Sequence, residues 1–353
     1  MTIREDAAAA LQPHGPRALT EGTAAPLAEA YDVALIDLDG VVYVGPEPVP
    51  HAPETLDEAR RRGMRLAYVT NNASRTPGSI AGHLDDLGVP AEPGDVVTSA
   101  QAAARLAAER VPPGAPVLMI GGAGLEEALR EHRLRPVRSA DDAPEAVVQG
   151  YSPDVGWRQL AEGAFAVQRG VPWIATNLDM TLPTQRGIAP GNGSLVAAVR
   201  AATGVEPVAA GKPELPLHRE SIIRTGARHP LVVGDRLDTD IEGAVRAGVD
   251  SLLLFTGVTA PAALLAAPPP LRPSYLAADL RGLLVPHPPV RAERGGWTCR
   301  GWHAAVRAGE AVLERVAGSA TADPYDGLRA LCAASWESEV APAAGKALTG
   351  LGL

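Results

Sequence analysis

The sequence has few cysteines, few lysines and no long apolar run, and each shortage narrows the class of protein. Its two cysteines, Cys299 and Cys332, both lie near the C-terminus. A single disulfide bond would stabilise little of a chain of 353 residues, so we expect free thiols and a reducing compartment. No stretch approaches the roughly 20 consecutive apolar residues of a membrane-spanning helix, so we expect no membrane association.

The first 30 residues also lack the compact apolar segment of a signal peptide, because charges interrupt their alanines. We predict that residues 1–30 form a flexible N-terminal tail and that the protein is cytoplasmic.

Positive charge is scarce as well, since the net charge is −9 and the pI is about 5.4. This balance argues against a general nucleic-acid or membrane-surface binder, so an anionic substrate must be held by local positive groups. Of the 32 basic residues only Lys212 and Lys346 are lysine. A lysine within a motif therefore indicates a chemical requirement rather than a general use of positive charge.

Two carboxylates follow the first predicted strand. Val33–Ile36 is a short apolar run typical of a buried parallel strand, and Asp37, Asp39 and Gly40 come directly after it. Strand positions two apart point the same way, so both carboxylates converge if the strand geometry reaches Asp39. Like charges that close need a cation or a shared proton, and hard oxygen ligands favour Mg²⁺. The alternative is an ordinary turn that ends the strand.

Predicted strands and helices alternate along the chain, which indicates an α/β fold with a doubly wound, mostly parallel sheet. Polar residues follow other predicted strands: Thr70-Asn71-Asn72 after Arg65–Val69, and Asp235 with Asp240 after Leu231–Val233. In such a sheet the carboxyl ends of the strands share one edge, where ligands bind. We expect these residues to gather there with Lys212.

Carboxylates, a divalent metal and an ammonium together suit phosphoryl transfer. The metal and the lysine neutralise phosphate oxygens, which lets an anionic nucleophile approach phosphorus. One aspartate can attack phosphorus while a second handles the protons. Two other readings stay open at this point: a phosphotransferase, and a regulatory phospho-acceptor that does not turn over. Asp39 favours an enzyme, because a protein that only accepts a phosphoryl group needs no second acid two residues after the first.

Four segments, in the order DLDGVV, TNN, GKP and GDRLDTDI, resemble the four motifs of haloacid dehalogenase superfamily phosphatases. The insertion between TNN and GKP is similar to the C2 type of cap domain of the type IIA subclass. The resemblance implies a catalytic core of residues 31–76 and 208–286, a cap of residues 77–207, and a C-terminal appendage of residues 287–353.

The resemblance also implies roles for the acidic residues. Asp37 would be the nucleophile and Asp39 the general acid and base. Mg²⁺ would be bound by Asp37, the backbone carbonyl of Asp39 and Asp235. Asp240 would support the metal from nearby, and whether it does so directly or through water stays open.

Phosphate, by the same resemblance, would be held by Thr70-Asn71-Asn72 and Lys212. The long irregular loop expected over Thr176–Gly193 would close over the leaving group, with Asp179 and Arg186 as candidates for substrate contact. Together, VVTSAQ, this loop and the appendage look most like bacterial glycerol 3-phosphate phosphatases. The expected partner is a small phosphorylated metabolite. Phosphoglycolate, nucleoside monophosphates and aryl phosphates remain alternatives, and a homodimer is possible.

Two other regions have competing interpretations. Gly121–Gly124 follows a predicted strand, but it lacks the GxGxxG spacing of a dinucleotide site, so we interpret it as a tight turn. In the appendage we expect a linker, HPPVRAERGGW, then helices near Trp302–Val316 and Tyr325–Trp336. Some relatives carry an appendage likened to part of an acetyltransferase. This one is too short for a complete acyl-CoA site, so we favour packing or an oligomer interface.

Overall fold

The structure is a computed structural model that describes residues 15–184, 186–293, 295–316, 323–338 and 342–353. The chain divides into two compact units, which we call the first unit (residues 1–66 and 227–353) and the second unit (residues 67–226). No helix of the described residues is long and apolar enough to cross a bilayer.

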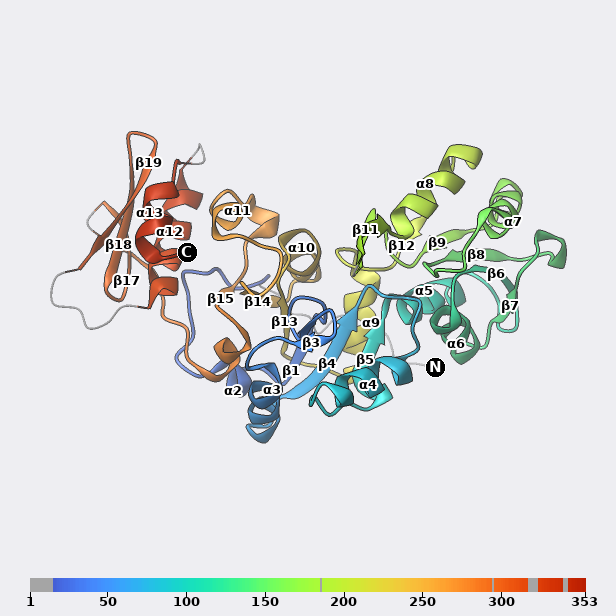
Figure 1. Cartoon of the computed structure of the whole chain (residues 1–353), viewed down its shortest axis with the longest axis horizontal. Coiled ribbons are helices and arrows are strands. Elements are labelled where there is room, and N and C mark those ends of the chain that lie inside the picture. Colours follow the sequence, from blue (N-terminus) through green and yellow to red (C-terminus); the bar gives the residue numbers. More distant parts are fainter. Residues whose placement is uncertain (1–14, 185, 294, 317–322, 339–341) are drawn as a thin grey trace. The chain divides into compact units, whose positions relative to one another are not determined.

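A six-stranded sheet carries the polar strand ends (Figure 1). Its strand order is β15 (Tyr275–Ala277), β14 (Asp250–Leu254), β13 (Pro230–Gly234), β1 (Val33–Ile36), β4 (Arg65–Thr70) and β5 (Val96–Thr98). The pairs β1/β13, β13/β14, β14/β15 and β4/β5 are parallel. Every residue of β1, β13 and β14 is buried, as expected of apolar strands covered on both faces. The α/β fold with a doubly wound, mostly parallel sheet is confirmed.

The helices of the first unit that precede the appendage are short. They are α2 (Leu27–Ala30), α3 (Ala52–Arg61), α10 (Glu242–Ala247) and α11 (Pro261–Leu265). A small hairpin of β2 (Tyr43–Val44) and β3 (Glu47–Pro48) follows the Asp37 loop.

The second unit has its own five-stranded sheet, in the order β12 (Val208–Ala209), β9 (Trp173–Ala175), β8 (Ala146–Gln149), β6 (Pro116–Ile120) and β7 (Arg135–Val137). All its pairs are parallel. The helices of this unit are α4 (Pro77–Asp86), α5 (Ser99–Ala108), α6 (Ala123–Glu131), α7 (Trp157–Gln168), α8 (Asn192–Thr203) and α9 (Leu215–Thr225). Strand β5 lies within the segment predicted as cap, yet it pairs with β4.

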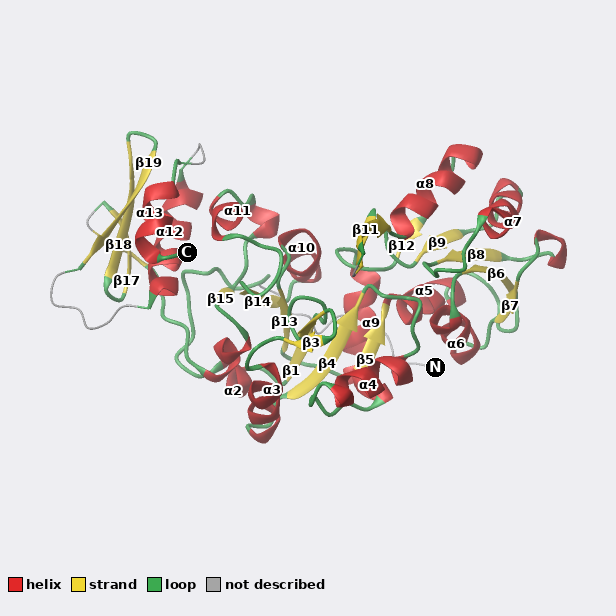
Figure 2. Ribbon diagram, in the orientation of Figure 1, coloured by secondary structure: helices red, strands yellow, loops and turns green. Residues whose placement is uncertain are grey.

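The loop predicted as irregular over Thr176–Gly193 contains a hairpin, so that expectation is corrected. Strands β10 (Thr181–Thr184) and β11 (Gly187–Pro190) pair antiparallel (Figure 2). The Thr184 hydroxyl donates to the carbonyl of Gly187 at 2.7 Å and closes the turn. Proline and glycine in this segment read as loop residues, but an exposed two-stranded ribbon tolerates them at its edges.

The helix predicted near Trp302–Val316 is wrong, because the appendage folds as a four-stranded antiparallel sheet there. Its order is β16 (Arg291–Glu293), β17 (Gly296–Cys299), β18 (Trp302–Arg307) and β19 (Glu310–Arg315). Ala308 and Gly309 have φ values of 52° and 80°, the two positive values of a tight hairpin turn. The alanines favour a helix locally, but pairing and burial decide the strand. The predicted linker over residues 287–297 likewise contributes β16 and the start of β17.

Helix α12 (Pro324–Glu337) confirms the helix predicted over Tyr325–Trp336, and α13 (Gly345–Leu351) follows it. Both helices contact the appendage sheet (Figure 1). The Asp323 side chain accepts from the N–H of Tyr325 at 3.0 Å and caps α12.

The tail predicted over residues 1–30 is wrong for residues 15–30, and residues 1–14 lie outside the described residues. The Thr23 N–H donates to the carbonyl of His287 at 2.7 Å, and the N–H of Val290 donates to the carbonyl of Thr20 at 2.9 Å. Leu27 is fully buried. The apolar side chains and the strand-like backbone bonds tie this segment to the first unit.

Candidate metal and phosphate site

Three carboxylates gather at the carboxyl ends of β1 and β13. Asp37, Asp235 and Asp240 each offer an oxygen, and these atoms lie within 4.8 Å of one another. Asp37 follows β1, and its N–H donates to the carbonyl of Val233 at 2.8 Å, which continues the β1/β13 ladder. Asp235 follows β13, and Asp240 lies in the helical turn Leu237–Ile241. The three residues come from segments about 200 positions apart in the sequence, yet they meet at one point.

Backbone donors fix two of these carboxylates. Asp235 is fully buried, and its Oδ2 accepts from the N–H of Val258 at 2.7 Å. Asp240 is 1% exposed, and its Oδ2 accepts from the N–H of Arg236 at 3.2 Å. Three acidic groups this close repel one another unless a cation balances them. A cluster of hard oxygen donors fits Mg²⁺.

Glycines allow the loops to approach Asp235 closely. Gly40 has a φ of +85°, and a Cβ there would lie 2.8 Å from Oδ2 of Asp235. A Cβ at Gly257 would overlap the same oxygen. The Thr256 hydroxyl donates to the carbonyl of Gly40 at 2.6 Å, so the loop after β14 contacts the loop after β1. The residues around Asp235 therefore form a tight backbone cage.

The Asp39 side chain does not join the three-carboxylate group. Strand β1 ends at Ile36, and Asp39 is exposed with its backbone bridged to Tyr43. The convergence expected of Asp37 and Asp39 as strand neighbours is therefore not what brings the acidic groups together. The N–H of Gly40 donates to the carbonyl of Tyr43 at 2.8 Å, which turns the chain there.

Within the second unit, Asn71 links Lys212 and Asp179. The Asn71 Nδ2 donates to Oδ2 of Asp179 and to the carbonyl of Lys212, both at 3.1 Å. The Asn71 Oδ1 accepts from the N–H of Lys212 at 2.8 Å. The Lys212 side chain is 6% exposed, and its Nζ donates to the carbonyl of Val69 at 3.3 Å. The structure thus brings together three of the predicted phosphate- and substrate-binding residues.

Thr70 and Asn72 take part in local turns beside this group. Thr70 is 3% exposed, and its Oγ1 accepts from the N–H of Asn72 at 3.0 Å. The Asn72 side chain accepts from the N–H and the hydroxyl of Ser74 at 2.9 and 2.8 Å. This pattern is an Asx turn, so the Asn72 amide shapes the backbone after β4.

Arg186 lies apart from the Asn71 group. It is exposed in the turn between β10 and β11, where its N–H donates to Oγ1 of Thr184 at 3.2 Å. The acidic group of Asp37, Asp235 and Asp240 belongs to the first unit, and the residues around Asn71 belong to the second.

The sequence reasoning missed several residues that hold these groups. Asn177 Nδ2 and the Ser99 hydroxyl donate to the carbonyl of Asn71 at 2.7 and 2.6 Å. The loop Thr256–Val258, which contacts Asp235 and Gly40, was missed as well. A signal was present for both, since Asn177 and Thr256 follow apolar strands just as the predicted residues do.

Most of the chain matches models of known protein families. Residues 34–135 match the family model of haloacid dehalogenase-like hydrolases, and residues 209–283 match the HAD-hydrolase-like model. Residues 299–353 match the model of a GCN5-related N-acetyltransferase like domain.

Named relatives and solved structures agree with these matches. The D-glycerol 3-phosphate phosphatase of Mycobacterium tuberculosis is 48% identical over 278 residues, which cover 76% of this chain and 78% of that protein. The 5'-nucleotidase YutF of Bacillus subtilis is 37% identical over 65% of this chain and 90% of its own length. A crystal structure of the M. tuberculosis glycerol phosphate phosphatase with magnesium has a TM-score of 0.84 at 42% identity, covering 93% of this chain and 98% of that one. The chain therefore belongs to the haloacid dehalogenase-like hydrolases.

Proposed function

We propose that this chain is a Mg²⁺-dependent phosphoric monoester hydrolase whose substrate is glycerol 3-phosphate. The observation that carries the proposal is the group of Asp37, Asp235 and Asp240, whose oxygens lie within 4.8 Å of one another. Family membership and the names of its relatives support a phosphatase. Three carboxylates this close together suit a divalent cation, which would balance the charge of a phosphate ester bound beside it.

In the first half of the reaction, Asp37 acts as the nucleophile. Bound Mg²⁺ would supply charge neutralisation for the phosphate oxygens and for the attacking carboxylate. An oxygen of Asp37 attacks phosphorus, and the bond from phosphorus to the ester oxygen breaks. Asp39 gives its proton to that leaving oxygen, which departs as an alcohol. Asp39 is exposed and is not part of the three-carboxylate group, which suits a residue that exchanges protons with the leaving group and with water.

In the second half, the aspartyl-phosphate on Asp37 is hydrolysed. Asp39, now ionised, takes a proton from water, and the water oxygen attacks phosphorus. The bond from phosphorus to the Asp37 oxygen breaks, which releases inorganic phosphate and restores the carboxylate. Asp39 ends the cycle protonated, ready for the next leaving group.

Lys212, Thr70 and Asn71 hold the phosphate in this proposal. Lysine is a compact point charge that suits both phosphate and nucleophile, and Lys212 is one of only two lysines in the chain. Its backbone is bound on both sides by the Asn71 amide, which sets the course of the chain at Lys212. The Thr70 hydroxyl, whose oxygen accepts from the N–H of Asn72, can donate its own proton to a phosphate oxygen.

The segment from Thr176 to Gly193 selects the leaving group. Asp179 belongs to this segment and accepts from Asn71 at 3.1 Å, so a substrate-contacting loop and a phosphate-binding loop share one hydrogen bond. A carboxylate at this position can accept a hydrogen bond from a substrate hydroxyl. We assign residues 77–207 to the cap domain that carries this segment. Arg186 at the hairpin tip remains a candidate for the same contact.

The substrate assignment is tested by steady-state kinetics with Mg²⁺ on a panel of phosphate esters. The panel contains glycerol 3-phosphate, phosphoglycolate, a nucleoside 5'-monophosphate, a sugar phosphate and nitrophenyl phosphate. We expect glycerol 3-phosphate to have the highest kcat/KM. Another ester ranking above it would overturn the substrate, and release from none of them would overturn the phosphatase.

Two substitutions in the cap domain test whether Asp179 contacts the substrate. Asp179→Asn should raise KM for glycerol 3-phosphate by about tenfold, the worth of one charged hydrogen bond. The matched control is Asp141→Asn, because the Asp141 side chain is 94% exposed on the same unit. Equal KM values for the two variants would remove Asp179 from substrate binding.

A further inference from the structure

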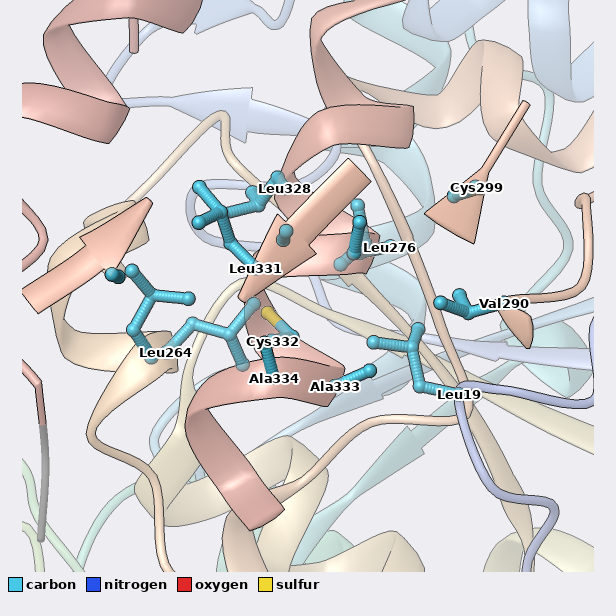
Figure 3. Packing of buried hydrophobic residues seen from close by; sticks show 14 of the residues in the cluster. Leu19, Leu264, Leu276, Val290, Cys299, Leu328, Leu331, Cys332, Ala333 and Ala334 are labelled. Carbon is cyan, nitrogen blue, oxygen red and sulfur yellow. The ribbon is translucent and has the colours of Figure 1, made fainter. Parts of the chain in front are cut away.

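A continuous apolar core joins the C-terminal appendage to the segments that carry the acidic group. Buried residues of the appendage, among them Cys299, Leu328 and Leu331, share one cluster with Leu264 and Leu276, which precede the appendage in the sequence (Figure 3). Helix α12 contacts both α11 and β15. The appendage is therefore packed on the catalytic segments through side chains, rather than joined to them only by the chain.

The same cluster reaches the helical turn that carries Asp240. Ile241 follows Asp240 directly, is fully buried and belongs to the cluster. Leu237, at the start of the turn, packs against the same residues. Asp240 thus lies in a turn whose two end residues, Leu237 and Ile241, pack in the core that the appendage shares. A shift of these side chains would move the carboxylate, because the turn is only five residues long.

A second contact reaches the loop that binds Asp235. The ring of Tyr325, at the start of α12, lies 5.6 Å from the ring of Phe255, with a tilt of 38° between the planes. Phe255 precedes Thr256–Val258, the loop that donates to Gly40 and Asp235. The aromatic pair therefore supports the base of this loop from the side of the appendage.

We propose that the appendage is a positioning element for the Mg²⁺ site, acting through Tyr325 on the Thr256–Val258 loop and through Leu237 and Ile241 on Asp240. This inference rests on the proposed function, since it takes the three aspartates as metal ligands. It assigns residues 287–353 a role in metal affinity. Tyr325 is a positioning residue, because its contact runs through Phe255.

The test is calorimetric titration of the metal-free full chain with MgCl₂, together with phosphate release as a separate readout. Tyr325→Leu should raise the Kd for Mg²⁺ at least fivefold, and Tyr325→Phe should restore it, because the ring contact returns. Phe255→Leu approaches the same contact from the other side and should match Tyr325→Leu. This second variant keeps the test available if one of the two folds poorly.

The matched control is Trp336→Leu, on the same helix. Trp336 is half-buried like Tyr325, and it also touches residues outside the appendage: its Nε1 donates to the carbonyl of Leu264 at 3.1 Å, and Arg272 lies 5.0 Å from its ring centroid. Trp336→Leu should lower the melting temperature and leave the Kd for Mg²⁺ within twofold of wild type. A Kd that changes equally in the Tyr325 and Trp336 variants, or in neither, would overturn the inference.

The wild-type titration separates this inference from the proposed function. A wild-type chain that binds no Mg²⁺ and releases no phosphate would overturn both. Wild-type binding with an unchanged Kd in Tyr325→Leu and Phe255→Leu would overturn the positioning role alone.

Discussion

The backbone N–H of Val258 donates a 2.7 Å hydrogen bond to Oδ2 of Asp235, so the loop after β14 holds one member of the three-carboxylate group. Gly257 precedes Val258, and a Cβ on Gly257 would overlap the same oxygen. The chain therefore has room for glycine alone at this position. Asp235 is fully buried, so it has little freedom to move aside.

Gly257→Ala should displace the Asp235 carboxylate and lower both Mg²⁺ affinity and kcat/KM, each by tenfold or more. The control is Gly82→Ala, since a Cβ there meets nothing within 4 Å and alanine favours a helix. Calorimetric titration and phosphate release measure the two effects. Wild-type values for Gly257→Ala would contradict the cage around Asp235.

Lys212→Arg should reduce kcat/KM by about 10²-fold or more, the usual loss when one aligned charge in an active site is misplaced. Lys212 is 6% exposed and its Nζ donates to the carbonyl of Val69 at 3.3 Å, and a larger planar guanidinium does not reproduce the position of a compact ammonium. Steady-state kinetics measure the effect.

Lys346→Arg provides the comparison, because the only other lysine of the chain is 92% exposed, with Nζ 3.9 Å from Glu310. It should retain wild-type kinetics. Full activity in Lys212→Arg would show that any positive group suffices.

The stability of the protein should fall as the pH drops below about 6.5, through His287. This ring is buried, and its Nε2 donates to the carbonyl of Gly282 at 2.9 Å. Its Nδ1 lies 3.2 Å from the guanidinium of Arg329, which only donates, so the ring is neutral. Burial, and then Arg329, lower the pKa of His287 from 6.5 to about 4.

The unfolded chain binds this proton near pH 6.5 and the folded chain only near pH 4, so folding loses stability across that window. The loss from this group reaches about 3 kcal/mol at the lower end. Urea unfolding between pH 7 and pH 5 should show a steeper loss for wild type than for His287→Gln. If wild type and His287→Gln lose stability equally between pH 7 and pH 5, groups other than His287 cause the loss.

Both thiols should resist alkylation in the folded protein. Cys299 and Cys332 are free and buried, and burial raises the pKa of Cys299 to about 12. Burial also raises the pKa of Cys332. Thiolates are the reactive form, so iodoacetamide at pH 7.5 should modify neither residue until urea unfolds the chain. Mass spectrometry counts the adducts, and rapid labelling of the native protein would contradict this packing.

The buried strands and the acidic strand ends were predictable because their signals are local. Val33–Ile36 is apolar throughout, and Asp37 follows it directly, so the strand and its first carboxylate could be placed from the sequence. The motif order predicted the α/β fold correctly. What the local signal missed is the geometry that gathers the acids, since Asp39 lies beyond the end of β1 and is not part of the group of Asp37, Asp235 and Asp240.

The remaining errors arise where contacts between segments distant in the sequence determine the local structure. The alanines of Trp302–Val316 favour a helix, but the segment pairs with β17 and packs under α12, so it forms strands. The Asn71 amide joins Lys212 and Asp179 from positions more than 100 residues away, and no sequence spacing encodes such bonds. Residues 15–30 belong to a segment predicted as a tail because residues 1–30 contain charges and no compact apolar run, and their contacts with His287 and Val290 are too distant in the sequence to be read from it.

The central claim, hydrolysis of a phosphate monoester by Asp37 with Mg²⁺, is tested most directly by one comparison. Phosphate release from glycerol 3-phosphate is measured for wild type and Asp37→Asn, each with MgCl₂ and with EDTA, after circular dichroism has shown both to be folded. We predict release only from wild type with MgCl₂. Release from Asp37→Asn at the wild-type rate, or release undiminished by EDTA, would contradict it.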